Sequence, residues 1–297
     1  DHPSLDGIIV FDRPEGAWNA AKSFLALCNA IRNRRYDIVI DFHGILKSGL
    51  LAWASRAPKR YGFARPRSQE GNFLFTNRRS SLPSHTLNRV EENMILCEAV
   101  VPARAGCPSA TIEVPPEVQE AVDDYVDRTF EAGKRLVAVH APIDRREKRW
   151  PLDYFAEVCD LLIADGRFEV MLTWGPGQQH IAQTVFARCR RGPVIAPETP
   201  DLKHYAGLVG RANLYVGGDT GPMHIAAAMG TPVVAIFTGT NAVQHAPYQS
   251  PCEVLTPERA HELLPQGETA EEALSPITPP MVYDACVRLL SPKKTAG

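Results

Sequence analysis

Short apolar runs that alternate with helix-like segments constrain the fold of this chain more than any other feature. Each run of valine, isoleucine and leucine stops at a glycine or a polar residue. The runs cover residues 36–40, 136–140, 170–174, 214–216 and 233–237, with helix-like segments at 117–132 and 155–164. Continuous apolar runs are typical of strands that helices cover on both faces. The pattern therefore predicts an α/β architecture with parallel sheets.

The length and the middle of the chain predict two domains. A chain of 297 residues is about two domains long, and Pro115-Pro116 interrupts the pattern before a new βαβ series begins. We place the boundary near residue 125, between an N-terminal domain at 1–125 and a C-terminal domain at 126–297. The first domain shows few strands, and a strand-like Ile8 to Phe11 follows a start without methionine or signal peptide. We therefore expect the first domain to be partial.

Composition excludes several classes of protein. Hydrophobic residues make up 44% and charged residues 22%, values that exclude disordered, collagenous and coiled-coil chains. The net charge of −2 gives no overall signature of nucleic-acid binding. The seven cysteines include no CxxC pair and no metal-like cluster, which favours a reducing compartment. With no apolar run of about 18 residues, the sequence predicts a cytoplasmic protein.

The strongest functional signal is the segment from Leu214 to Gly230. A strand ends, Gly217 and Gly218 permit a tight turn, and a helix begins with Pro222 in its first turn. Free backbone N–H groups and the helix dipole at such a start bind anionic oxygens such as those of a diphosphate. The alternative is an Asp-Thr helix cap without a ligand, with His224 a buried core histidine. A cap alone needs neither Gly221 nor His224, so the segment favours a ligand site.

A lysine in the loop after the strand at 136–140 is the candidate cation. Lys148 follows His140-Ala141-Pro142 and a polar loop, and it precedes Trp150-Pro151. Open α/β sheets bind ligands beyond the carboxyl ends of their strands, where such a lysine reaches a phosphate. The alternative is a solvated charge among its neighbours Arg145, Arg146 and Arg149.

Two further strand ends carry polar residues. Trp174-Gly175-Pro176-Gly177-Gln178 offers backbone and amide groups to a nucleotide, or is simply a βα turn that requires glycine. In the first half, the turn from Asp41 to Ser48 brings together a carboxylate, the His43 imidazole and the Lys47 ammonium. These groups would face the same crevice as the other strand ends, or would form a capped turn with solvated side chains.

A basic segment lies between Lys47 and Val90. It holds nine basic residues and one acidic residue, Glu70, which gives a local charge of +8 by subtraction. Aromatic residues such as Trp53 and Tyr61 are interleaved with these charges, which suits nucleic acid and equally a phosphorylated lipid or sugar. The asymmetry predicts an anionic partner on the first domain, although a solvated basic face is the simpler alternative.

Several of these motifs, in this order, resemble glycosyltransferase family 9, the ADP-heptose:lipopolysaccharide heptosyltransferases. The resemblance extends from about residue 1 to residue 290, and in residues 36–79 it is closer to heptosyltransferase I than to II. The most specific part is Asp219-Thr220-Gly221 followed by His224. The others are Asp41-x-x-Gly44-x-x-Lys47-Ser48, Lys59-Arg60-Tyr61-Gly62, His140-Ala141, Lys148-x-Trp150-Pro151 and Trp174-Gly175-Pro176.

The resemblance implies a GT-B fold, with two Rossmann-like domains, and inverting transfer of heptose from ADP-heptose to the Kdo-containing inner core on lipid A. It implies no metal, cofactor or nucleic acid, and a place at the inner face of the inner membrane as a peripheral protein beside its anionic lipid-linked acceptor. It assigns catalytic roles to Lys148 and Asp219. Donor contacts would come from Thr220, Gly221, Pro222, Met223, His224, Trp174, Gly175 and Gln178, and acceptor contacts from Lys47, Ser48 and Arg60.

Two departures from the family pattern limit the residue roles that the resemblance assigns to this chain. No residue matches the family's proposed general base, an aspartate near the N-terminus, so Asp41 and His43 are the substitutes. Where heptosyltransferase I has a ribose-binding glutamate, this chain has Gln178 or Gln179, which hydrogen-bonds hydroxyls without charge. The alternatives are a GT-B transferase for another nucleotide sugar, which donor titration would distinguish, and a non-catalytic nucleotide-sugar or lipid-binding module.

Overall fold

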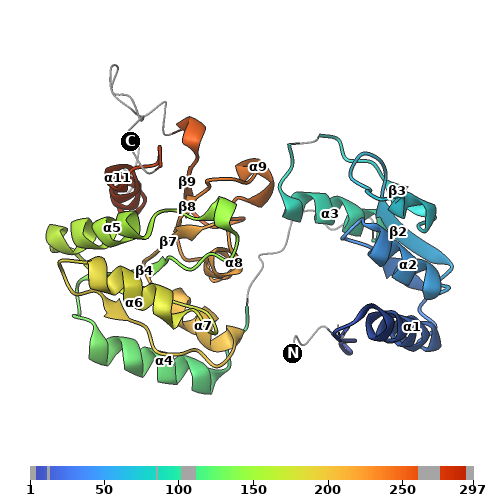
Figure 1. Cartoon of the computed structure of the whole chain (residues 1–297), viewed down its shortest axis with the longest axis horizontal. Helices are drawn as coiled ribbons and strands as arrows, with labels where there is room; N and C mark the ends of the chain where they lie inside the picture. The colour runs from blue at the N-terminus through green and yellow to red at the C-terminus, as the bar shows by residue number, and fades with distance from the viewer. Residues whose placement is uncertain (1–4, 12–13, 85, 102–111, 260–274, 292–297) are drawn as a thin grey trace. The chain divides into compact units, whose positions relative to one another are not determined.

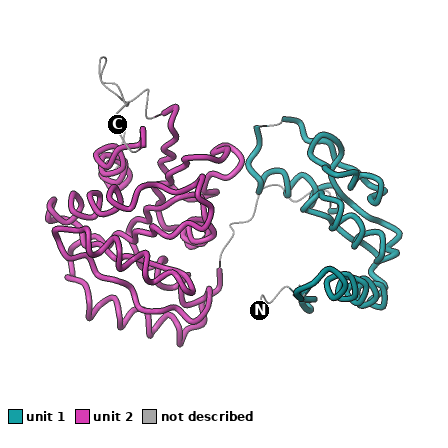
Figure 2. The backbone as a smooth tube through the Cα atoms, viewed as in Figure 1, with its two compact units in different colours: residues 1–107 teal, residues 108–297 magenta. Residues whose placement is uncertain are grey.

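The computed structural model describes residues 5–11, 14–84, 86–101, 112–259 and 275–291. The chain forms two compact units, unit 1 at residues 1–107 and unit 2 at residues 108–297 (Figure 2). The boundary predicted near residue 125 is wrong, because it falls inside helix α4 (Pro116–Thr129). The buried side chains of Val122 and Val126 on α4 belong to a core cluster of unit 2, so the helix folds with the second sheet.

Unit 1 contains a three-stranded parallel sheet in the order β1-β2-β3. Its elements are α1 (Ala17–Asn33), β1 (Ile38–Ile40), α2 (Leu46–Ala54), β2 (Lys59–Phe63), η1 (Asn72–Leu74), β3 (Arg78–Ser80) and α3 (Arg89–Val100). The expected strand at Ile8 to Phe11 does not form: Ile8 and Val10 are exposed, and this run pairs with no described strand. An apolar run becomes a strand only where a neighbouring edge accepts its backbone hydrogen bonds.

Unit 2 contains a six-stranded parallel sheet in the order β6-β5-β4-β7-β8-β9. The strands are β4 (Arg135–His140), β5 (Phe168–Thr173), β6 (Val194–Ile195), β7 (Leu214–Gly218), β8 (Val233–Ile236) and β9 (Cys252–Leu255). The runs at 136–140, 170–174, 214–216 and 233–237 are thus confirmed as strands, and 36–40 gives β1. The sequence pattern missed β2, β3 and β9, which contain charged residues, and β6, whose apolar run is only two residues long.

Helices cover both faces of the unit 2 sheet, as Figure 1 shows. They are α4, α5 (Leu152–Asp165), α6 (Gln179–Arg188), α7 (Leu202–Gly210), α8 (Gly221–Ala228), α9 (Ala242–His245) and α11 (Pro279–Leu290), with the short η2 (Arg146–Lys148) before α5. In β4, Val137 and Val139 pack in the cluster that contains α5 and α11, whereas Leu136 and Ala138 pack in the cluster that contains α7. Alternate residues of a strand point to opposite faces, which explains the continuous apolar runs. No described helix has the length and apolarity needed to cross a membrane.

The order of the unit 2 strands fixes where a ligand can bind. The chain continues from β4 to β5 and β6 on one side, and returns to β7, β8 and β9 on the other. The order therefore reverses between β4 and β7, and open α/β sheets bind ligands at that switch point, beyond the strands' carboxyl ends. His140 pairs with Gly217 and Gly218 with Ile236, so the loops after β4, β7 and β8 leave the sheet together.

Candidate functional site

The turn between β7 and α8 lies at the switch point. Thr220 is the N-cap residue of α8. A Cβ at Gly218 would come within 2.6 Å of the Ile143 side chain, and one at Gly217 within 2.8 Å of the Tyr215 hydroxyl. Neither glycine has a positive φ, so close packing requires them rather than the turn conformation that the sequence suggested. A Cβ at Gly221 would meet nothing within 4 Å, so the space before the helix start is open.

The loop after β4 brings Lys148 to this turn. The Lys148 Nζ donates to Asp219 Oδ2 at 2.6 Å, although 71 residues separate the two in the chain. Thr240, in the segment after β8, donates its hydroxyl to the same oxygen at 2.7 Å. The ring nitrogen Nε2 of His224 lies 3.8 Å from Asp219 Oδ1. Segments that follow β4, β7 and β8 thus meet around one carboxylate.

Asp219 is ionised in this environment. Its side chain is only 7% exposed, and burial by itself raises the pKa of a carboxyl group. The nearby His224 ring and the hydrogen bonds from Lys148 and Thr240 outweigh that effect and hold the pKa of Asp219 well below its ordinary value. The Lys148 ammonium is therefore held beside a fixed negative charge at the start of α8.

Other predicted donor contacts lie in different surroundings. The alternative of a buried core histidine is wrong for His224: its side chain is 48% exposed and lies near Asp219. Met223 is fully buried in the core. The indole of Trp174 is also buried and donates to the carbonyl oxygen of Ala196 at 2.9 Å. The side chains of Met223 and Trp174 are therefore not placed to meet a ligand, while Pro222 occupies the first turn of α8.

Gln178 connects two loops at the same sheet edge. Its amide nitrogen Nε2 donates to Asp144 Oδ1 at 2.8 Å, and its Oε1 accepts from the Gly175 backbone N–H at 3.3 Å. Asp144 belongs to the loop that carries Lys148. Gln178 therefore ties the loop after β5 to the loop after β4, and its amide groups are engaged within the protein.

A buried polar cluster lies behind the strand ends. His140 Nδ1 is 3.0 Å from the Thr173 hydroxyl, and the Tyr205 hydroxyl is 3.3 Å from that same group. Burial lowers the pKa of His140 to about 3, so its imidazole is neutral. His140, Thr173 and Tyr205 hydrogen-bond to one another and carry no charge. The charged pair at this sheet edge is Lys148 with Asp219.

In unit 1, the strand end after β1 is a hydrogen-bonded turn. Asp41 Oδ1 accepts from the backbone N–H groups of His43 at 3.0 Å and Gly44 at 3.1 Å. Asp41 Oδ2 accepts from the Ser48 hydroxyl at 2.9 Å and the Asn72 amide at 2.6 Å. All four partners belong to unit 1, so Asp41 and Ser48 hold the turn together. The His43 imidazole is exposed, and no described residue hydrogen-bonds to it.

The basic segment of unit 1 divides into two groups. Arg60 donates to the carbonyl oxygens of Phe75 and Ala57, and Arg67 and Arg89 both pair with the buried Glu92. Glu92 lies just beyond the segment whose charge was counted, so part of the +8 is neutralised within the fold. Lys47 and Arg56 remain exposed without an ion pair to any described residue.

Sequence reasoning missed Thr240 and Asp144. Both follow strands at the same edge as Lys148 and Asp219, Asp144 after β4 and Thr240 after β8. The sequence signal for Thr240 was the run at 233–237, which ends in Thr238-Gly239-Thr240. A polar residue that follows any predicted strand is a candidate site residue, because the carboxyl ends of parallel strands lie at one edge of the sheet.

Two parallel α/β units, with a lysine and a helix start at the switch point of the second, match the architecture of GT-B glycosyltransferases. The family model of glycosyltransferase family 9 (heptosyltransferase) matches residues 24–268, and the chain belongs to that family.

Relatives and solved structures agree with this family. The chain is 26% identical over 249 residues to the lipopolysaccharide core heptosyltransferase OpsX of Haemophilus influenzae, covering 82% of this chain and 67% of that protein. It is 25% identical to lipopolysaccharide heptosyltransferase 3 of Escherichia coli, over 84% of this chain and 72% of that protein. A Veillonella parvula family 9 structure has a TM-score of 0.79 at 24% identity, with 97% and 83% of the two chains covered. The E. coli heptosyltransferase WaaC with ADP has a TM-score of 0.67 at 21% identity, with 92% and 80% covered. These likenesses confirm the predicted GT-B fold.

Proposed function

We propose that this chain transfers heptose, with inversion, from ADP-heptose to the Kdo-containing inner core on lipid A. The observation that carries the proposal is the meeting of Lys148, Asp219 and the start of α8 at the switch point of unit 2. The names of the relatives support it: OpsX is a lipopolysaccharide core heptosyltransferase, and WaaC was crystallised with ADP.

The donor diphosphate would lie before α8, in the open space at Gly221. Backbone N–H groups at the helix start and the Lys148 ammonium would stabilise the negative charge that develops on departing ADP. Asp219 would keep Lys148 in place and charged. Thr220 and His224 would border the same space, and the engaged Gln178 amide would position the loop that carries Lys148.

The acceptor would bind unit 1 through the exposed Lys47 and the turn after β1. Ser48 and Arg60 would support this surface from within, since their polar groups are engaged by unit 1. Between the two candidates for general base, we propose His43, because the four hydrogen bonds to Asp41 occupy the lone pairs that would accept a proton.

Titration calorimetry with ADP, UDP and GDP tests the donor site, followed by a transfer assay with ADP-heptose and a Kdo-bearing acceptor. We expect ADP to bind and Lys148→Ala to weaken that binding. Tighter binding of UDP or GDP would assign another nucleotide sugar. Binding of ADP without transfer to any acceptor would favour a non-catalytic nucleotide-sugar module.

The His43 assignment is tested separately by His43→Ala in the transfer assay, with ADP binding as its control. A loss of turnover with unchanged ADP binding is expected. Full turnover in His43→Ala would remove His43 as the base.

A further inference from the structure

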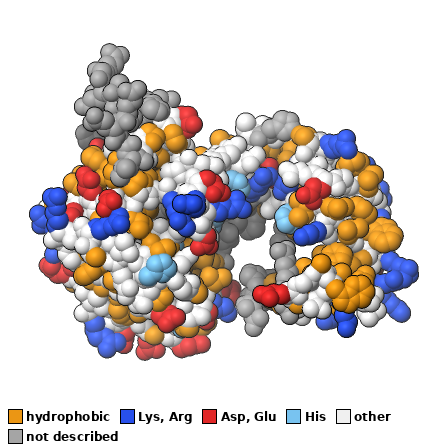
Figure 3. Space-filling view, in the orientation of Figure 1, with side chains coloured by type: hydrophobic (Ala, Val, Ile, Leu, Met, Phe, Trp, Pro, Cys, Tyr) orange, Lys and Arg blue, Asp and Glu red, His pale blue; other side chains and the backbone are white. Residues whose placement is uncertain are grey.

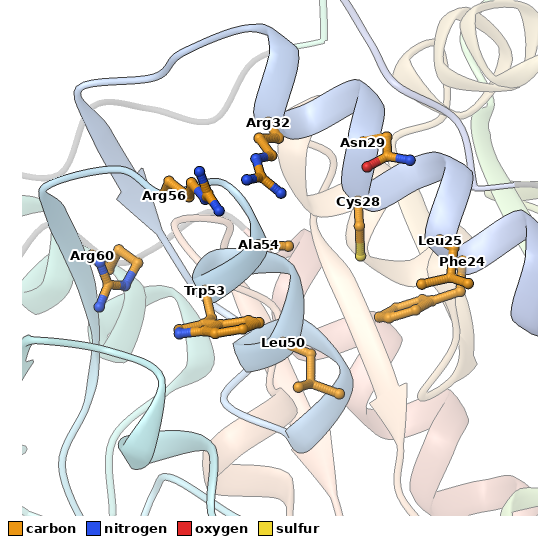
Figure 4. Close-up of a pocket in the computed structure, with 10 residues that line it drawn as sticks. All are labelled: Phe24, Leu25, Cys28, Asn29, Arg32, Leu50, Trp53, Ala54, Arg56 and Arg60. Atoms are coloured by element: carbon orange, nitrogen blue, oxygen red, sulfur yellow. The ribbon is translucent and has the colours of Figure 1, made fainter.

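A pocket of about 560 Å³ lies between helices α1 and α2 of unit 1, away from the turn after β1. Its lining is apolar and basic, without an acidic side chain: Phe24, Leu25, Cys28, Asn29, Arg32, Leu50, Trp53, Ala54, Arg56 and Arg60. Figure 4 shows the side chains of Arg32 and Arg56 together at one end, and those of Phe24, Trp53 and Leu50 towards the other. The pocket is therefore amphipathic along its length.

The apolar end is open to solvent. Trp53 is 61% exposed and Leu25 is 63% exposed. Trp18, Leu25 and Arg32 follow one another at intervals of seven residues on α1, and residues about two turns apart lie on the same helix face. Figure 3 shows hydrophobic side chains gathered beside Lys and Arg side chains on unit 1. Contiguous exposed apolar patches mark interaction sites.

Of the arginines that line the pocket, Arg60 donates to carbonyl oxygens of unit 1, whereas Arg32 and Arg56 carry its available positive charge. No described residue forms an ion pair with Arg32 or Arg56. An adjoining pocket shares both arginines and adds Arg35, with a single acidic residue, Asp37. Arg35 and Arg56 have φ of 53° and 56°, in the left-handed region that favours glycine. The backbone at Arg35 and Arg56 would therefore accept glycine without strain, so replacing either arginine by glycine tests its side chain.

We propose that this face of unit 1 binds the surface of a bilayer that contains anionic phospholipids. Tryptophan side chains favour the membrane interface, where Trp53 and Trp18 would lie with Leu25. The arginines at the other end complement lipid phosphates, and each basic residue near an anionic surface strengthens binding about fivefold. A merely solvated basic face would not require an exposed tryptophan, Trp53, in the same pocket. This surface rests on the proposed function, because an enzyme with a lipid-linked acceptor is expected to contact a membrane. Its test requires neither the donor nor the transfer reaction.

Vesicle co-sedimentation tests the proposal with the whole chain. Vesicles of phosphatidylcholine with phosphatidylglycerol are expected to bind the protein, and vesicles of phosphatidylcholine alone are not. Trp53→Ala and Leu25→Ala should weaken binding severalfold, whereas Leu202→Ala, an exposed leucine of unit 2 (69% exposed), should leave it unchanged. Arg56→Gly should weaken binding about fivefold without loss of stability, because glycine favours that backbone; Arg191→Gly in unit 2 is its control.

Tryptophan fluorescence gives an independent reading. The four tryptophans comprise exposed Trp18 and Trp53 in unit 1 and buried Trp150 and Trp174 in unit 2. Anionic vesicles should shift the emission to shorter wavelength, less so in Trp53→Phe, and inorganic phosphate alone should not.

Four outcomes would overturn the proposal. They are equal binding to neutral vesicles, unchanged binding in Trp53→Ala and Arg56→Gly, binding of single-stranded oligonucleotide in place of vesicles, and a Trp53-dependent dimer without vesicle binding. Any of these outcomes would reject the membrane-binding surface. If ADP-heptose transfer still proceeds, the proposed reaction is unaffected.

Discussion

Asp41 in unit 1 and Asp219 in unit 2 occupy equivalent positions. Each follows a parallel strand directly, and the two residues are 5% and 7% exposed. The hydrogen bonds of Asp41 come from its own turn and from the neighbouring Ser48 and Asn72. Those of Asp219 come from side chains in other segments, one of them the Lys148 ammonium.

The difference separates a carboxylate that holds its own turn together from one that lies beside the proposed ligand site. At Asp41 every acceptor position is filled by a neutral donor of unit 1, and nothing remains for a ligand. At Asp219 the partner is a cation beside an open helix start. A buried aspartate after a strand therefore does not indicate a ligand site by itself; its partners and the space beside it do.

The largest expected effect is on the stability of unit 1. Asp41→Ala removes the acceptor of four hydrogen bonds, and leaving buried donors unpaired should lower the free energy of unfolding by about 3 kcal/mol. Urea denaturation measures this change, with the exposed Asp37→Ala as control. Equal stability of the two variants would contradict the structural role of Asp41.

Lys148→Ala should have its main effect on activity. Loss of one charged group that stabilises a departing diphosphate should lower kcat/KM about 100-fold. The variant also leaves the buried Asp219 carboxylate without its cation, so the unfolding midpoint should fall as well. Arg145→Ala removes an exposed arginine of the same loop and should change kcat/KM little. Similar kcat/KM values for the two variants would return Lys148 to the class of solvated loop charges.

Gly221→Ala probes the open space before α8. The fold should tolerate the methyl group, and helix propensity should offset any loss of stability. A ligand that approaches the helix start would meet it, so the Kd for ADP should rise about tenfold, or about 1.4 kcal/mol. Gly192→Ala, which also has nothing within 4 Å, is the matched control for calorimetry. Unchanged ADP affinity in Gly221→Ala would move the diphosphate elsewhere.

Thr240→Val should have the smallest effect. It removes one hydrogen bond to Asp219, worth about 1 kcal/mol, and kcat/KM should fall about fivefold. Thr240→Ser should restore kcat/KM, because it keeps the hydroxyl that donates to Asp219. An unchanged kcat/KM in Thr240→Val would show that this hydrogen bond does not support the site.

The sequence predicted most of the unit 2 sheet and the meeting of Lys148 with the Asp219 turn, because apolar runs locate buried parallel strands and their carboxyl ends share an edge. It missed β2 and β3, whose exposed lysine and arginines hide the strand pattern. It also left Asp41 open as a substitute general base, since hydrogen-bond partners that are distant in the chain, such as Asn72, leave no local signal.

The neutral His140 makes unit 2 sensitive to acid. In the native state its pKa is about 3, against an ordinary value of 6.5, so between these values the unfolded chain binds a proton that the folded one does not. The contribution of His140 to the free energy of unfolding is therefore fully present above about pH 6.5 and is lost as the pH falls towards 3. Thermal melts at stepwise lower pH should show this decline, less steeply in His140→Gln. Acidification would thus disable the unit that carries Lys148 by unfolding it, before Asp219 itself titrates.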